Sequence, residues 1–300
     1  MATTSGVVES RMAEGTDVEK ASDVPYQASI RLLENDRHLA SGAILNVRFV
    51  VTQASFIWKL RGQYPEQTLQ ALVRIRFGQV NLQSGGNDQF QAIQSYVLHP
   101  EFNFTEANHD LAVLKTLGLI EFNEAVQPIS LLPGPIPDNV AVRYTDWGSD
   151  KDFATPDDYK PKLQQMDAIA LSNAQCRDLL GTLSNLGSIL YDSRVCIYSN
   201  ETASVCMGNA GGPLVMFQNG QPRLVAVMNF AYGACDPAYP AGFERLWNHN
   251  RWLVETATID YKYANFGKMC TIVRNVAAQM LANKQRAVRE RKAARDFLRK

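Results

Sequence analysis

The stretch that decides the fold is Cys206-Met207-Gly208-Asn209-Ala210-Gly211-Gly212-Pro213-Leu214-Val215. An Asn-Gly pair at 219–220 follows it and signals a turn. The run Leu224-Val225-Ala226-Val227 comes next, and a short apolar run beside a turn signal is typical of a buried β-strand. The segment therefore belongs to a part of the chain that is built from short strands.

Strand signals of the same kind extend outward from this stretch, over residues 24 to 250. Val73, Ile75 and Phe77 alternate with two arginines, a period of two that suits a half-buried antiparallel strand. Phe49-Val50-Val51 is a further apolar run, and turn signals lie at 85–88 and 133–135. Many short strands separated by turn signals indicate an all-β sandwich or a pair of β-barrels.

The composition fits a globular protein, since 300 residues with 46% apolar and 20% charged residues are enough to bury a substantial core. No apolar run reaches the roughly 20 residues that a membrane-spanning helix needs. The first 15 residues show neither a basic start nor an apolar segment, so no signal peptide is visible, which taken alone predicts a cytosolic protein.

Near the end of the chain the strand-like pattern gives way to a helical one. A short helix is expected to begin at Trp252, and Met269 to Met280 repeat with a helical period. From Lys284 to Lys300 there are eight basic and two acidic residues, a balance of +6 in a chain of zero net charge. This basic helix either binds an anionic membrane or polysaccharide, or is simply solvated. Nucleic acid is not an expected partner, because only Phe297 interleaves the basic residues.

Several segments, in order, resemble the trypsin/chymotrypsin family of serine proteases. They are Arg11–Gly15, Pro25–Ile30, Ser41–Leu45, Phe49–Phe56, His99–Asn103, His109–Lys115, Asp146–Gly148 and Cys206–Val215. The resemblance implies an all-β fold of two six-stranded antiparallel barrels, with a C-terminal helix and an additional helical basic tail. It places an activation-like segment at residues 1–11, a protease-like domain at 12–258 and a C-terminal extension at 259–300.

The same resemblance implies that the catalytic triad is degenerate. The nucleophile position holds Ala210, whose methyl group cannot attack a carbonyl, and the general-base position holds Ser55, whose hydroxyl cannot accept a proton near neutral pH. Asp110 stands at the position of the orienting carboxylate, either as a surviving triad member or as a structural acceptor. We therefore expect no peptidase activity.

No other histidine is expected to replace the base. His109 adjoins Asp110 and, on a strand, points to the opposite face. His38, His99 and His249 stand in unrelated segments of the sequence. No metal site and no cofactor are expected.

The resemblance also assigns a pocket and an activation site. Gly208 and Ala210 stand at the oxyanion-hole positions. The pocket-like positions, which either hold a peptide or merely pack, are Ser204 at the base, Ala231 and Ala241 on the walls, Phe230 in place of tryptophan and Asn229 in place of serine. The activation-like cleavage lies at Arg11-Met12, and the partner position for the freed amino group is the neutral Asn209.

The cysteines bear on the compartment. The resemblance pairs Cys176 with Cys196 and Cys206 with Cys235, while Ala40 and Phe56 replace the family's disulfide beside the catalytic histidine. Two retained pairs favour an oxidising compartment and hence a secreted protein, against the visible N-terminus. Cys270 is left over, either as an ordinary helix residue or for an intermolecular bridge.

These observations lead to three hypotheses. The first is a non-catalytic, insect-like homologue that binds proteins, such as proteases or their substrates, as a cofactor or decoy in an extracellular proteolytic cascade. The second is an unconventional hydrolase that uses other residues of the same cleft. The third is a scaffold that acts through its basic tail at 284–300.

Overall fold

The computed structural model describes residues 15–83, 89–149, 156–181, 192–199, 205, 210–231 and 236–259. The chain separates into a unit of residues 1–259 and a unit of residues 260–300. The predicted basic tail, with Cys270, lies outside the described residues. Among the helices of the described part, none is long and apolar enough to cross a membrane.

Six strands of the N-terminal half close into the first barrel. They are β2 (Gln27–Leu32), β3 (His38–Ile44), β4 (Phe49–Thr52), β5 (Val73–Phe77), β6 (Gln89–Leu98) and β7 (Ala112–Thr116), paired in the order β2-β3-β4-β7-β6-β5. Each pairing is antiparallel, and closure leaves no unpaired sheet edge. The alternation predicted for 73–77 is confirmed, since Val73, Ile75 and Phe77 are buried and the two arginines between them are only partly so.

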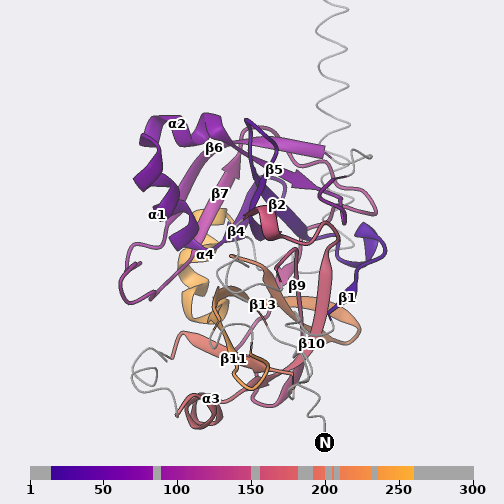
Figure 1. Ribbon diagram of the computed structural model, residues 1–300, viewed down its shortest axis with the longest axis vertical. Coiled ribbons are helices and arrows are strands. Elements are labelled where there is room, and N and C mark those ends of the chain that lie inside the picture. The colour runs from indigo at the N-terminus through magenta and orange to yellow at the C-terminus, as the bar shows by residue number, and fades with distance from the viewer. Residues whose placement is uncertain are drawn as a thin grey trace, which may run out of the picture. The chain divides into compact units, whose positions relative to one another are not determined.

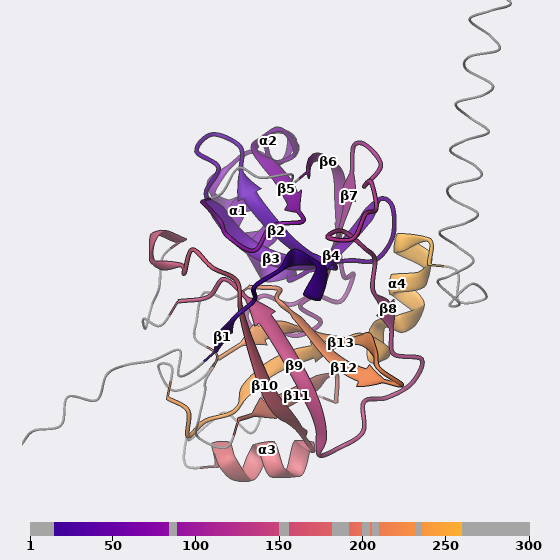
Figure 2. The same cartoon turned by 90° about the vertical axis from the view of Figure 1, so that its right-hand side faces the viewer.

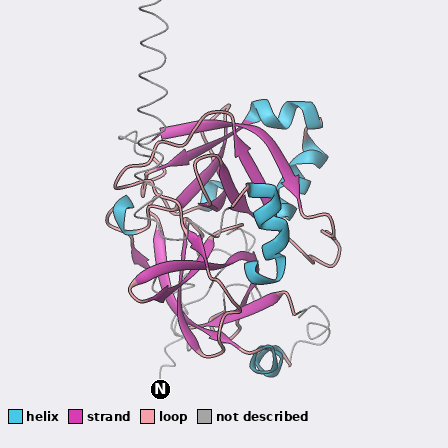
Figure 3. Ribbon diagram, turned by 180° about the vertical axis from the view of Figure 1, so that it is seen from behind, coloured by secondary structure: helices cyan, strands magenta, loops and turns pink. Residues whose placement is uncertain are grey.

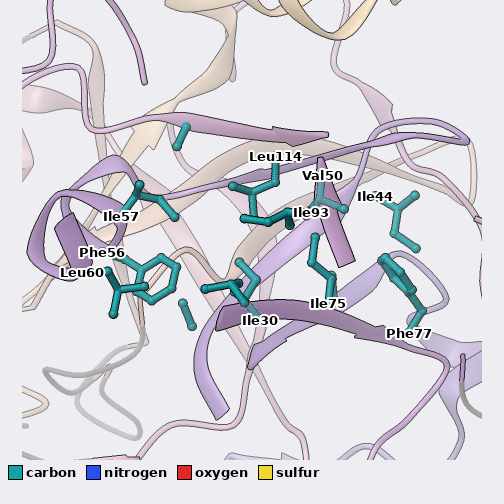
Figure 4. Close-up of a cluster of buried hydrophobic side chains, with 14 of the residues drawn as sticks. Ile30, Ile44, Val50, Phe56, Ile57, Leu60, Ile75, Phe77, Ile93 and Leu114 are labelled. Atoms are coloured by element: carbon teal, nitrogen blue, oxygen red, sulfur yellow. The ribbon is translucent and has the colours of Figure 1, made fainter. Parts of the chain in front are cut away.

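Two helices that the sequence pattern did not predict lie between β4 and β5: α1 (Ala54–Gln63) and α2 (Glu66–Leu72). Figure 4 shows Phe56, Ile57 and Leu60 of α1 in the same core as Ile30 and Ile75 of the barrel. Ala40 and Phe56, at the positions where the resemblance expects cysteines, both belong to this apolar cluster. Packing thus fills the place that the resemblance gives to a disulfide.

The second barrel comes from the C-terminal half. Its strands are β9 (Val140–Asp146), β10 (Gln164–Leu171), β11 (Arg194–Tyr198), β12 (Pro213–Gln218), β13 (Gln221–Phe230) and β14 (Ala241–Arg245). They close in the order β9-β10-β11-β14-β13-β12, because β12 pairs with β9. The short strands β1 (Thr16–Asp17) and β8 (Ser130–Leu131) add to β10 and β13. Figures 1 and 2 show the two barrels one above the other, which confirms the predicted pair of six-stranded barrels.

The remaining helices are short and lie at the periphery (Figure 3). They are η1 (Ala21–Asp23), η2 (Pro156–Asp158), α3 (Asn173–Leu180), η4 (Leu246–His249) and α4 (Asn250–Ala257). Ser172 caps α3 in a capping box with Gln175. The predicted C-terminal helix is present, but it begins at Asn250 and not at Trp252.

One of the two expected disulfides lies within the described residues. Cys176 of α3 is bonded to Cys196 of β11, which confirms that pair. The bond closes a loop of 20 residues, for which the chain-entropy model gives about 3 kcal/mol of stabilisation. The expected pair Cys206–Cys235 lies outside the described residues.

Candidate functional site

The three triad positions come from three separate segments. Ser55 lies in the first turn of α1, Asp110 just before β7, and Ala210 shortly before β12. The Ser55 backbone N–H donates to Asp110 Oδ1 at 2.6 Å, which joins the first two positions directly. The carbonyl oxygen of Ala210 accepts a hydrogen bond of 2.8 Å from the backbone N–H of Ser41 in the first barrel. The fold therefore gathers all three positions where the two barrels meet.

Gly211 fixes how closely Ala210 approaches the first barrel. Its φ is +74°, in the left-handed region that favours glycine. A Cβ built on it would stand 2.6 Å from the Ser41 carbonyl oxygen and 3.0 Å from the Gln53 backbone nitrogen. The segment after Ala210 is thus pressed against the backbone two residues before Ser55.

Asp110 is fully buried, and its donors in the described part of the chain are not imidazoles. Besides the Ser55 backbone N–H on Oδ1, the Gln53 side chain donates from Nε2 to Oδ2 at 2.8 Å. Burial raises the pKa of Asp110 to about 6, although the bonds from Ser55 and Gln53 oppose this shift. Both oxygens of the carboxylate are therefore engaged by structural donors.

The sequence analysis missed Gln53. Its Nε2 also donates to the backbone carbonyl oxygen of Asn229 at 2.8 Å, so that one side chain bridges Asp110 in the first barrel to β13 in the second. The available signal was a long amide side chain two residues before the base position. Asn229 continues the network, because its Nδ2 donates to Glu244 Oε2 at 3.2 Å.

Of the pocket-like positions, the structure describes Asn229, Phe230, Ala231 and Ala241. The ring of Phe230 lies where a Cβ on Gly242 would stand, and the Arg194 guanidinium carbon is 5.0 Å from the centroid of that ring. Ala241 is 5% exposed and belongs to the core of the second barrel, and Ala231 packs against that core. The aromatic ring therefore occupies the space beside Gly242.

Several expected site residues lie outside the described residues. They are Ser204, Gly208, Asn209 and the activation-like bond Arg11-Met12. Their assignments remain predictions.

The buried carboxylate of Asp146 lies beside Gly212, in the segment 206–215. Asp146 Oδ1 accepts from Ser41 Oγ at 2.6 Å and from the Trp147 backbone N–H at 2.7 Å, and Oδ2 accepts from the Tyr144 hydroxyl at 2.6 Å. A Cβ on Gly212 would lie 2.6 Å from Oδ2, so only glycine fits there. Burial raises the pKa of Asp146 to about 6, against the opposing effect of its hydrogen bonds.

The raised pKa predicts how an Asp146→Asn variant responds to pH. The folded carboxyl keeps its proton up to about pH 6, whereas the unfolded one loses it near the ordinary value of 3.8. The stabilisation from protonation is thus fully present only below the unfolded pKa of 3.8 and is lost as the pH rises through 6. The variant has no such loss, so its stability relative to the unaltered protein should rise by about 2 kcal/mol between pH 4 and 7. Urea unfolding of both proteins across this range measures the difference, and parallel curves would contradict the assignment.

Comparisons with known proteins agree with this geometry. The family model described as Trypsin matches residues 13–253. Trypsin-1 of Astacus astacus is 27% identical over 251 residues, which cover 81% of this chain and 98% of that protein. Serine protease 1 of Homo sapiens is 27% identical over 82% of this chain and 89% of its own length, and Trypsin of Sus scrofa is 25% identical over 79% and 91%. The chain belongs to the trypsin family of serine proteases.

Proposed function

We propose that this chain is a non-catalytic member of the family, of the insect-like kind, which binds protein partners as a cofactor or decoy in an extracellular proteolytic cascade. The observation that carries the proposal is the pair Ser55 and Ala210 at the positions of the base and the nucleophile. A hydroxyl and a methyl group there supply neither a proton acceptor nor a nucleophile. The partners we propose are proteases or their substrates.

The surroundings of Asp110 support the loss of catalysis. In an active triad the carboxylate accepts a hydrogen bond from the histidine and holds it in the correct tautomer. Here its oxygens accept from Gln53 Nε2 and from the Ser55 backbone N–H. The carboxylate thus serves to join the two barrels, a role that needs no histidine.

We expect the partners to bind through the surface around the cleft. On α1, the ring of Trp58 stacks on Phe104 at 3.8 Å between centroids, and Trp58 remains 44% exposed. Exposed aromatic side chains of this kind are enriched where proteins bind one another.

A secreted location is part of the proposal. The Cys176–Cys196 disulfide supports it, because such bonds persist in oxidising compartments.

The proposal is tested by treating the purified full chain with a fluorophosphonate probe and a panel of peptide ester substrates, beside active trypsin. We expect no stoichiometric labelling and turnover about a million-fold or more below that of trypsin, as for a triad that has lost its nucleophile or base. Stoichiometric labelling would overturn the proposal. Capture of partners from extracellular fluid with the unaltered chain and with Trp58→Ala then tests the binding half. Equal capture by both would mean that the stacked pair of Trp58 and Phe104 is not part of the binding surface.

A further inference from the structure

Three of the four histidines in the sequence converge on one point. His99 follows β6, His109 precedes β7, and His249 ends η4. One ring nitrogen of each lies within 4.8 Å of one nitrogen of each of the others. These residues lie in separate segments of the sequence, and the fold brings His249 against two loops that lie 150 and 140 residues earlier in the chain.

The backbone explains why His109 takes part. The residue is not on a strand, as the sequence analysis assumed, but in a turn with a φ of +50°. Histidine is among the residues that enter this left-handed region more often than most. The turn directs the ring against His99, and the two rings stack with centroids 5.0 Å apart and planes 10° apart.

A buried carboxylate already holds the His249 ring from the side away from the cluster. His249 Nε2 lies 2.7 Å from Glu244 Oε1, and the Glu244 carboxylate is fully buried. An Nε2–H that donates to this carboxylate leaves Nδ1 as the acceptor. Nδ1 lies 3.2 Å from His99 Nε2, inside the cluster. A buried carboxylate behind a histidine is the arrangement that orients metal-ligating imidazoles in proteins.

His109 supplies an independent sign of a missing ligand. Its Nδ1 is buried and has no hydrogen-bond partner among the residues that the structure describes. Buried polar atoms of side chains are nearly always hydrogen-bonded, so an orphaned imidazole nitrogen needs an explanation. The side chain as a whole is 26% exposed, which leaves a path from solvent to the cluster.

We propose that His99, His109 and His249 bind one Zn²⁺ ion, with Glu244 as the orienting carboxylate. Tetrahedral zinc with nitrogens at about 2.0–2.1 Å holds them about 3.3–3.4 Å apart. The 3.2 Å between His249 Nδ1 and His99 Nε2 already matches this spacing, and the third nitrogen has to move by at most about 1.5 Å from the 4.8 Å limit. Imidazole ligands suit zinc better than magnesium or calcium, which prefer oxygen.

Binding of the ion moves one proton within the His99 ring and breaks two hydrogen bonds. His99 Nδ1 accepts from the Glu101 backbone N–H at 3.2 Å, so the neutral ring carries its proton on Nε2, which faces His249 Nδ1 at 3.2 Å. When the ion binds Nε2 and His249 Nδ1, the proton of the His99 ring moves to Nδ1, and both hydrogen bonds are lost. Two hydrogen bonds of 3.2 Å are weak beside three metal–nitrogen bonds.

The ion would join two loops of the first barrel, one of which leads directly into Asp110, to the end of η4. This role is structural and does not depend on the proposed function.

The test uses the full chain, stripped of metal with a chelator and with free thiols alkylated, and titrated with Zn²⁺ in a calorimeter. We expect one ion per chain, and a Co²⁺-loaded sample should show the absorption of tetrahedral cobalt without a thiolate charge-transfer band. His109→Asn should weaken Zn²⁺ binding at least about 100-fold, because loss of a ligand costs more than loss of a group that only orients a ligand. Asparagine also tolerates the left-handed turn, so this variant is expected to fold.

The matched control is His38→Asn, at the one histidine outside the cluster, with folding checked by circular dichroism; we expect it to bind Zn²⁺ as the unaltered chain does. The inference fails if the unaltered chain binds no stoichiometric Zn²⁺, if cobalt reports thiolate ligands, or if His109→Asn binds with unchanged affinity. The cobalt spectrum of the unaltered chain decides the matter even where a variant does not fold.

Discussion

Replacing Gly211 by alanine is expected to lower the free energy of unfolding by about 2–5 kcal/mol. Two costs add at this position. The φ of +74° disfavours any residue with a Cβ, by about 1–2 kcal/mol. The new methyl group would also meet the Ser41 carbonyl oxygen at 2.6 Å and the Thr52 hydroxyl, so the contact between the barrels would have to open. Overpacking of a close contact costs about 1–3 kcal/mol more.

Gly220 provides the matched control for this prediction. It has the same φ of +74°, but a Cβ there would meet no atom within 4 Å. Gly220→Ala should therefore show the backbone cost alone, about 1–2 kcal/mol. Urea unfolding of the unaltered chain, Gly211→Ala and Gly220→Ala at one pH gives the loss of unfolding free energy for each variant. Equal losses in the two variants would mean that the barrel contact yields freely and that Gly211 is kept only for its turn.

Much of the fold could be predicted because its signals are local. The alternation at Val73, Ile75 and Phe77 and the Asn-Gly turn at 219–220 depend only on neighbours in the sequence, and both lie in strands or a tight turn as expected. Helices α1 and α2, which fill the connection between β4 and β5, could not be predicted in this way. Their stability comes from packing Phe56, Ile57 and Leu60 onto the barrel, which no local period reveals.

The site shows where prediction from sequence stops. The resemblance located Ser55, Asp110 and Ala210, because each lies inside a motif that can be aligned. Gln53 lies in the same motif, yet its role depends on a bond to a carbonyl 176 residues away. The histidine cluster depends on tertiary packing in the same way. Contacts between side chains that meet only where the two barrels pack together cannot be recognised from the local sequence pattern.

Repairing the triad is expected to fail while Gln53 remains. A histidine at position 55 needs an Asp110 oxygen to accept its Nδ1–H. Gln53 Nε2 already donates to Oδ2 at 2.8 Å and is held from the other side by the Asn229 carbonyl oxygen at 2.8 Å. The variant Ser55→His with Ala210→Ser should therefore react only slowly with a small fluorophosphonate. Adding Gln53→Ala should raise the labelling rate by about 10³–10⁴, the effect of a correctly oriented histidine.

The controls separate this cause from a general loosening of the cleft. Ala210→Ser with Gln53→Ala keeps Ser55 and lacks an imidazole, so it should label no faster than the unaltered chain. A small probe is used because it places no side chain in the space that the Phe230 ring fills. Should the double and triple repairs label at the same rate, Gln53 is no obstacle and the Asp110 carboxylate remains available to a base. A large step would instead mean that Gln53 has taken over the carboxylate to hold the barrels together, so that restoring the two missing groups alone no longer restores the reaction.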